Sequence, residues 1–184
     1  MLNKRRVLRL KDYDYSEPGA YFVTICTQNR KHLFGEIANG EMRLNEFGKI
    51  VQGCWDDLPN HYGRINLDAF VIMPNHTHGI IWILDGYGNV GAGFKPAPTP
   101  ATRNRNHRHG IPEIVRAFKT FASRRVNESR TTPGVAVWQR NYYEHVIRND
   151  EELFQTRQYI QENPLQWDLD PENPNCEPAV LVSK

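Results

Sequence analysis

Cysteine is scarce in this sequence. The three cysteines, Cys26, Cys54 and Cys176, lie far apart along the chain and form no C-x-x-C pair. An odd number of dispersed thiols fits neither a disulfide framework nor a zinc knuckle, so we expect all three to be reduced. None of them is a candidate nucleophile.

A long hydrophobic run is also missing. No stretch approaches the ~18 apolar residues that a membrane-spanning helix requires. Residues 1–6 lead into no apolar segment of the kind that secretory signal peptides contain. We therefore expect a cytoplasmic protein that makes no membrane contact.

The net charge is small, +2 at neutral pH, so the total charge does not by itself indicate a nucleic-acid partner. The charges are nevertheless segregated. Basic residues gather in two segments, which contain Lys4, Arg5, Arg6, Arg9 and Lys11, and Arg103, Arg105, Arg108, Arg116, Lys119, Arg124 and Arg125. Such clusters are common on ordinary solvated surfaces, but two in one chain of this size also fit a face that binds phosphate.

The composition is typical of a folded globular domain. With 184 residues, of which 39% are hydrophobic and 11% aromatic, the chain is long enough for one domain with a substantial core. We place this single domain at residues 1–174 and a tail at 175–184. Residues 85–110 are rich in Gly, Pro and Arg and lack periodicity, so we expect a mobile loop there.

The most informative segment is Phe70–Leu84, in which His76 and His78 interrupt an apolar, β-like run. Side chains two positions apart on a strand point to the same face. Two imidazoles held side by side in this way could bind a divalent metal ion, although two partly exposed strand histidines with ordinary hydrogen bonds fit the same spacing. A metal site requires further ligands.

A helix near the other end of the sequence offers a third ligand. Asn149 is a good N-cap, acidic residues follow it, and Pro164 ends the pattern. Leu153 and Ile160 mark the buried stripe of this helix.

Tyr159 and Asn163 are four residues apart on that helix, so a phenol and a carboxamide share one face at the edge of the stripe. A boundary tyrosine and a C-cap asparagine would give the same pattern.

The remaining elements form a mixed pattern. We expect strands at 21–28, 65–73 and 77–84, a hairpin at 36–38 and 41–44, and helices from the Asn45 cap to about Tyr62 and from Pro112 onward. In the second of these helices we expect Ile114, Val115, Phe118, Phe121, Ala122 and Val126 to face inward, and Arg116 with Lys119 to face outward. This order predicts an α+β sandwich, an antiparallel sheet with helices packed on one face.

Five ordered blocks of the sequence resemble the single-tyrosine HUH transposases, most closely the REP-associated tyrosine transposases. The blocks are Tyr21–Arg30, Asn39–Gly48, Val71–Gly79, Val137–His145 and Tyr159–Pro164. The resemblance implies a ferredoxin-like or RRM-like core with the two histidines on a central strand. It also implies that His76, His78 and Asn163 bind the metal and that Tyr159 attacks a DNA phosphate.

Elementary chemistry agrees with these implied roles. A tyrosine with a pKa near ~10 is scarcely ionised at neutral pH, and a divalent cation would stabilise the charge that develops on the phosphoryl oxygens. Two imidazoles and an amide oxygen suit Mg²⁺ or Mn²⁺. The expected partner is single-stranded or hairpin DNA, held by Arg103, Arg105, Arg108, Arg116 and Lys119, and the expected assembly is a monomer or a homodimer.

Two other functions fit parts of the pattern. A non-catalytic DNA-binding module of the same shape would stack bases on aromatics such as Tyr21, Tyr142 and Tyr143. A metal-dependent hydrolase would need a carboxylate base near the histidines, and Asp68 is the candidate that the strand pattern offers. Tyr142 and Tyr143 lie in a segment with strand-like character, so Tyr159 is the expected nucleophile.

Overall fold

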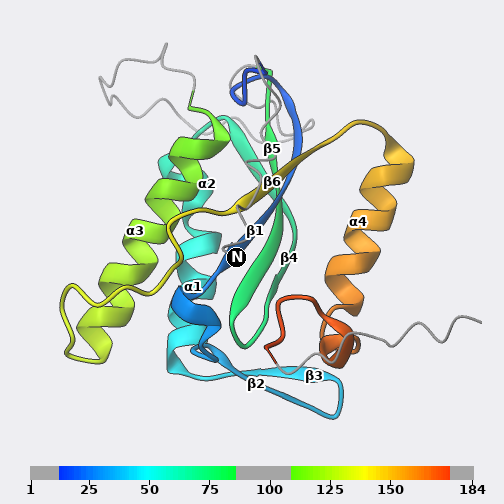
Figure 1. Cartoon of the computed structure of the whole chain (residues 1–184). Helices are drawn as coiled ribbons and strands as arrows, with labels where there is room; N and C mark the ends of the chain where they lie inside the picture. The colour runs from blue at the N-terminus through cyan, green and yellow to red at the C-terminus, as the bar shows by residue number, and fades with distance from the viewer. Residues whose placement is uncertain (1–12, 86–108, 175–184) are drawn as a thin grey trace, which may run out of the picture.

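The computed structural model describes residues 13–85 and 109–174 of the chain. Its centre is a four-stranded sheet in which all neighbouring strands are antiparallel (Figure 1). In spatial order the strands are β4 (Ile65–Ile72), β5 (His76–Ile83), β1 (Gly19–Cys26) and β6 (Tyr143–Ile147). β5 and β1 are therefore the inner strands, and β6 forms one edge.

Alternation along β5 divides its side chains between two buried faces. Ile81 and Ile83 belong to the main hydrophobic core. Ile80 belongs to a smaller cluster on the opposite face, and His76 and His78 share its parity along the strand. The histidines therefore lie on the face with the smaller apolar cluster.

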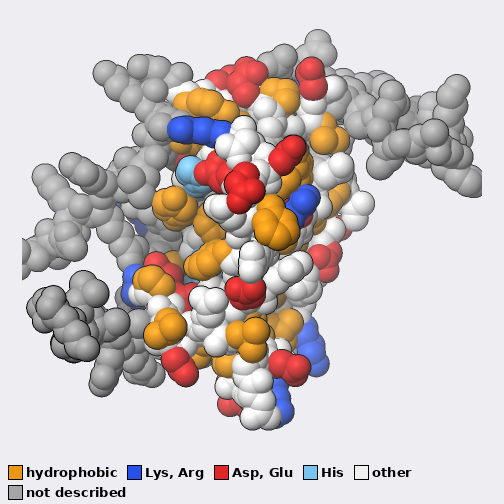
Figure 2. Space-filling model, turned by 90° about the vertical axis from the view of Figure 1, so that its right-hand side faces the viewer, with side chains coloured by type: hydrophobic (Ala, Val, Ile, Leu, Met, Phe, Trp, Pro, Cys, Tyr) orange, Lys and Arg blue, Asp and Glu red, His pale blue; other side chains and the backbone are white. Residues whose placement is uncertain are grey.

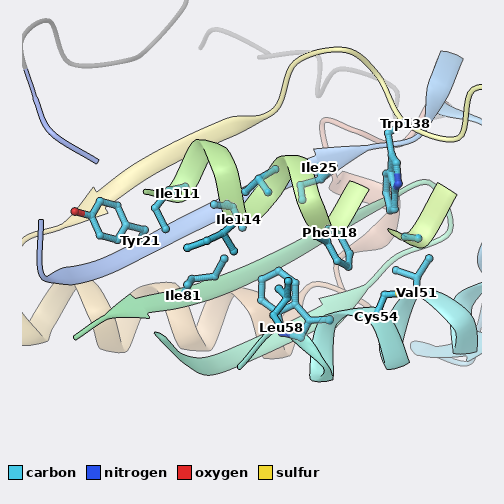
Figure 3. Packing of buried hydrophobic residues seen from close by; sticks show 14 of the residues in the cluster. Tyr21, Ile25, Val51, Cys54, Leu58, Ile81, Ile111, Ile114, Phe118 and Trp138 are labelled. Carbon is cyan, nitrogen blue, oxygen red and sulfur yellow. The ribbon is translucent and has the colours of Figure 1, made fainter. Parts of the chain in front are cut away.

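Three helices contribute to the main core, and each is amphipathic because its apolar residues must be buried against the sheet. They are α1 (Glu46–Asp56), α2 (Leu58–His61) and α3 (Ile111–Ser129). Asn45 caps α1 by accepting a hydrogen bond from the Gly48 N–H. In Figure 3, α3 presents Ile114 and Phe118 to this core, and Leu58 packs into it from α2.

The last long helix, α4 (Asp150–Glu162), covers the opposite face (Figure 1). Its buried residues Leu153 and Ile160 form the second cluster with Ile80, Ala20 and Ile147. The predicted α+β class and antiparallel sheet are confirmed, and α4 is a further layer beyond the helices expected on one face.

Gly79 allows the main core to approach β5 closely. A Cβ atom at this position would lie 2.5 Å from the Trp55 ring and 2.9 Å from Phe70. These two rings are stacked, with their centroids 4.2 Å apart. The glycine that follows His78 is therefore explained by packing on the opposite side of the strand.

Several local predictions can be compared with the structure. The hairpin is confirmed as β2 (Gly35–Ala38) and β3 (Glu41–Leu44), and the helix predicted to start at Pro112 is α3, which begins one residue earlier at Ile111. The helix predicted to reach Tyr62 is instead broken at Asp57, because Pro59 has no backbone N–H and cannot continue the hydrogen-bond ladder.

The prediction that Phe121 faces inward is wrong. Its side chain is 39% exposed and stacks on His61 at the surface.

The predicted tail at 175–184 and nearly all of the predicted loop at 85–110 lie outside the described residues. Among residues 13–85 and 109–174, no helix has both the length and the apolarity needed to cross a membrane.

Candidate active site

His76 and His78 are buried side by side on β5, 0% and 3% exposed. Their Nε2 atoms are 2.9 Å apart. Adjacent ligands of an octahedral ion with metal–ligand distances of about 2.1 Å lie roughly 3 Å apart. The spacing of the two ring nitrogens therefore suits a shared cation.

The opposite edge of each ring makes a hydrogen bond that holds the ring in place. The Asn75 amide donates to the backbone carbonyl of Glu172 at 2.7 Å, so its Oδ1 faces the His76 ring and accepts from Nδ1 at 2.8 Å. His78 Nδ1 lies 2.8 Å from the Thr24 hydroxyl, which can accept in the same way. Both Nε2 atoms are then left with a lone pair for a metal.

Electrostatics also favour neutral imidazoles. Burial lowers the pKa of His76 to about 4, against the opposing effect of the Asp170 carboxylate, which lies 3.7 Å from Nε2. Burial, with the neighbouring His76, holds the pKa of His78 well below its usual value. The short distance to Asp170 suggests an ion pair, but desolvation is the larger effect on His76, so both rings are neutral and able to bind a cation.

Asn163 is the C-cap of α4 and is 2% exposed. Its amide nitrogen donates to Asp170 Oδ2 at 3.0 Å, which fixes the orientation of the amide. Its Oδ1 is buried and has no hydrogen-bond partner in the described part of the chain. A buried acceptor without a partner costs about 1–3 kcal/mol, and a cation bound at this site would offset that cost.

Asp170 is the site residue that the sequence analysis missed. Its carboxylate is 4% exposed, follows the short helix η2 (Trp167–Leu169) and accepts from the Glu172 N–H at 2.6 Å. Ligand atoms of His76, His78 and Asp170 all lie within 4.8 Å of one another. Asp170 belongs to no helical or strand pattern in the sequence. It reaches the histidines only because the chain folds back toward β5 after Pro164.

The segment after α4 is anchored to this site by residues distant in sequence. Arg30 forms an ion pair with Glu172 at 2.8 Å and donates to the Pro171 carbonyl at 3.0 Å. Trp167 stacks on His76 with ring centroids 6.1 Å apart. Figure 1 shows this orange to red segment lying between the lower end of α4 and the sheet.

Tyr159 projects from α4 to the same centre. Its side chain is 42% exposed, and its hydroxyl lies 3.2 Å from His78 Nε2. Burial of the hydroxyl end, with a further contribution from Asp170, raises the pKa of Tyr159 to about 12. The phenolate therefore needs a nearby positive charge to form at neutral pH.

The other candidate tyrosines lie elsewhere. Tyr142 donates its hydroxyl to Glu144 at 2.6 Å, and Tyr143 begins β6 and packs edge-on against Phe22. Tyr21 is fully buried in the main core, so its ring offers no surface for a base. The strand-like character expected of this segment is confirmed for Tyr143.

The basic residues expected to contact DNA are only partly described. Arg116 is exposed on α3. Lys119 does not face outward as predicted, because its ammonium donates to the backbone carbonyls of Gln139 and Arg140 at 2.7 and 2.9 Å. One N–H of that ammonium is left for a DNA contact, which stays a prediction. Arg103, Arg105 and Arg108 lie outside the described residues.

Asp68 does not serve the site as the hydrolase alternative required. Its carboxylate accepts from Arg157 and from the Trp82 indole, both at 2.8 Å, and the Arg157 contact ties α4 to β4. Asp170 is instead the carboxylate beside the histidines.

The donors present fit a divalent metal. Two neutral imidazoles, a carboxylate and an amide oxygen form a mixed nitrogen and oxygen set of the kind that binds Mn²⁺ or Mg²⁺. The His76, His78 and Asp170 cluster could therefore hold a metal ion.

Two curated proteins are similar to this chain in sequence. The chain is 40% identical over 172 residues to an uncharacterized protein of Haemophilus influenzae, covering 92% of this chain and 93% of that protein. It is 25% identical over 152 residues to a second H. influenzae protein, provisionally named a REP-associated tyrosine transposase, covering 83% of this chain and 73% of that protein. No family model matches the chain.

A solved structure with the same fold is available for comparison. It is that of a REP-associated tyrosine transposase bound to a REP hairpin, with a TM-score of 0.56 and 16% sequence identity, covering 87% of this chain and 74% of that one. The chain is therefore similar to REP-associated tyrosine transposases in sequence and in fold.

Proposed function

We propose that the protein is a metal-dependent single-stranded DNA transesterase that cleaves DNA through Tyr159 and rejoins the strands. One observation carries the proposal: the Tyr159 hydroxyl lies 3.2 Å from His78 Nε2, where the two imidazoles and Asp170 converge. A nucleophile beside a cluster of metal-ligating side chains is the arrangement that phosphoryl transfer requires.

In the proposed reaction Tyr159 loses its proton and its oxygen forms a bond to a DNA phosphorus. The bond from that phosphorus to the 3′-oxygen breaks, leaving a 5′-phosphotyrosine link and a free 3′-hydroxyl. Attack by a 3′-hydroxyl on the linked phosphorus reverses these changes and restores Tyr159. A bound Mg²⁺ or Mn²⁺ would polarise the phosphoryl oxygen and stabilise the phenolate and the developing charge.

The chain's own residues supply the geometry. His76, His78, Asn163 and Asp170 would hold the ion, while Thr24 and Asn75 keep the two rings in position. The exposed part of Tyr159 leaves its ring accessible to a substrate from solvent. Because the related structure carries a REP hairpin, we propose single-stranded or hairpin DNA as the substrate.

Intact-mass spectrometry after incubation with Mn²⁺ and single-stranded or hairpin oligonucleotides tests the proposal. We expect a covalent protein–DNA adduct and a released strand that ends in a 3′-hydroxyl. Binding without cleavage would contradict the proposal and indicate a DNA-binding module.

Metal-dependent hydrolysis is a second candidate, favoured by the position of Asp170. A carboxylate 3.7 Å from a ligating imidazole could serve as a base for water as well as a ligand. Cleavage products without any adduct, even in rapid-quench samples, would support hydrolysis and overturn the transesterase proposal.

A further inference from the structure

A groove of about 580 Å³ lies between α3 and residues 136–142, the segment that leads into β6. Its lining combines Arg116 and Lys119 of α3 with Trp138, Arg140 and Tyr142 of that segment. Lys119 joins the two walls through its hydrogen bonds to the carbonyls of Gln139 and Arg140.

The charge of the groove is positive. Arg116 and Arg140 are exposed, and neither forms an ion pair with another residue of the described ranges. No Asp or Glu is among the described residues that line the groove. Glu144, the acidic residue of β6, is buried and accepts the Tyr142 hydroxyl. The two guanidinium groups are therefore available for an anionic ligand.

The floor is apolar and carries a buried donor. Val115 and Val137 are buried in the lining, and Trp138 beside them is only 6% exposed. The Trp138 indole nitrogen has no hydrogen-bond partner in the part of the chain that the structure describes. Cations above an apolar, aromatic floor match a nucleic-acid strand, because phosphates can bind the guanidinium groups while sugars or bases cover the floor.

The position of the groove relative to the metal ligands also fits a DNA strand. Trp138 and Val115 belong to the main core, so the groove is on the opposite side of the sheet from His78 and Tyr159. Across the sheet, the Phe22 ring stacks on His78 at 5.4 Å and contacts the ring of the exposed Tyr143 at 6.2 Å. Tyr143 is on the edge strand, directly after the groove residue Tyr142. The rings of His78, Phe22 and Tyr143 therefore form a continuous series from the candidate metal site to the edge of the sheet, next to the groove.

The α4 side is less suited to phosphate. The first turn of α4 carries Asp150, Glu151 and Glu152, and Figure 2 shows acidic side chains gathered on that side of the molecule. Away from the metal site, these carboxylates would repel the phosphates of a DNA strand. The cationic groove next to β6 is the better site for the DNA backbone.

We propose that this groove binds the phosphate backbone of the DNA substrate at a distance from the scissile phosphate. The inference rests on the proposed function for the identity of the ligand. In this arrangement the strand passes from the metal site over Tyr143 at the edge of the sheet, and Arg116 and Arg140 bind its phosphates. The groove then contributes to substrate affinity and not to the chemical step.

The test replaces Arg116 and Arg140 together with Gln and measures binding of fluorescent single-stranded and hairpin oligonucleotides over a salt series in EDTA. Loss of two phosphate contacts should reduce the log–log salt slope for the single strand by about 1.4 and weaken binding at least tenfold at 0.1 M salt. Arg124→Gln is the matched control, because Arg124 is on the same helix but pairs with Glu128 and does not line the groove. It should bind like the wild type.

A second variant tests the groove while leaving Arg116 and Arg140 in place, so that a change in the fold caused by the double substitution can be recognised. Thr120→Glu places a negative charge on the exposed wall of the groove and should also weaken binding. Adduct formation with Mn²⁺ at saturating DNA separates this inference from the proposed function, because the groove variants should retain it. An unchanged salt slope in Arg116→Gln/Arg140→Gln, or wild-type affinity in Thr120→Glu, would overturn the groove proposal whether or not the wild type forms an adduct.

Discussion

The two faces of the sheet differ in what they bury. The face covered by α1 and α3 buries a core of 21 residues, whereas the α4 face buries an apolar cluster of five, counted over the described parts of the chain. The α4 face also buries His76, His78, Asn163 and Asp170. One face supplies most of the apolar burial that stabilises the fold, and the other holds polar groups that are costly to bury.

This difference indicates how the protein divides stability and chemistry. Because the larger core is on the opposite face of the sheet from His76 and His78, the fold should survive changes at the proposed metal ligands better than changes in that core. On the α4 face, the unpartnered Asn163 Oδ1 and the two facing imidazoles reduce the stability of the fold, because they are polar groups buried without full hydrogen bonding. The predictions below test this division, from the largest effect to the smallest.

The first prediction concerns the histidines. His76→Ala combined with His78→Ala should abolish metal binding and DNA cleavage, since it removes both imidazole ligands. EDTA should stop cleavage by the wild type without unfolding it, because the main core does not depend on the ion. His61→Ala, at the exposed end of α2, is the control and should cleave normally. Thermal melting and cleavage assays would measure both effects, and an apo protein that is unfolded at room temperature would contradict the division.

The second prediction concerns Asp170. Asp170→Asn keeps the shape of the side chain but removes its charge, so Mn²⁺ should bind about 10–100-fold more weakly in calorimetric titrations. Asp168→Asn is the matched control, because Asp168 is exposed two residues earlier on the same segment. Equal Mn²⁺ affinities of Asp170→Asn and the wild type would exclude Asp170 from the metal site.

The third prediction concerns the main core. Gly79→Ala should reduce the free energy of unfolding by about 1–3 kcal/mol, because the new methyl group overlaps the buried Trp55 ring. Gly53→Ala, where no atom lies within 4 Å of the added Cβ, should instead stabilise α1 by about 0.5–1 kcal/mol. Denaturant unfolding of both variants measures these free energies. If Gly79→Ala has the same free energy of unfolding as the wild type, the core accommodates the added methyl group and the prediction is wrong.

The fourth prediction is the smallest and concerns the attachment of α4. Hydrogen bonds from Arg157, more than any other contact, lower the pKa of Asp68 to about 2. Because this pKa is below its ordinary value near 4, the Asp68–Arg157 pair should stabilise the fold above that value and lose its contribution as the pH falls toward 2. Asp68→Asn should therefore cost roughly 1 kcal/mol or less at pH 6 and only a small part of that at pH 2. A constant cost across this range, measured by denaturant unfolding, would contradict the assignment.

Local patterns in the sequence predicted the strand and the helix that carry the candidate site residues. Strand parity put His76 and His78 on one face, and the Asn149 cap with the Leu153 and Ile160 stripe defined the helix that carries Tyr159. These features depend on residues within a few positions of one another, where periodicity and capping are informative.

Contacts between distant segments could not be predicted in the same way. Asp170 reaches the histidines only because the chain folds back after Pro164, and the Lys119 ammonium is held by carbonyls about 20 residues away. Phe121 is exposed although the helical pattern favoured its burial, since α3 has more apolar residues than its contact with the sheet covers. Such outcomes depend on tertiary packing and leave no local signal.

Identification of the tyrosine that carries the DNA tests the central claim most directly. Wild-type protein, Tyr159→Phe and Tyr143→Phe would be incubated with single-stranded DNA and Mn²⁺, digested with protease and analysed by mass spectrometry for the peptide that bears the phosphonucleotide. The account predicts an adduct on Tyr159 in the wild type and in Tyr143→Phe, and none in Tyr159→Phe, which should still bind metal and DNA. DNA attached to Tyr142 or Tyr143, or cleavage by Tyr159→Phe, would contradict it.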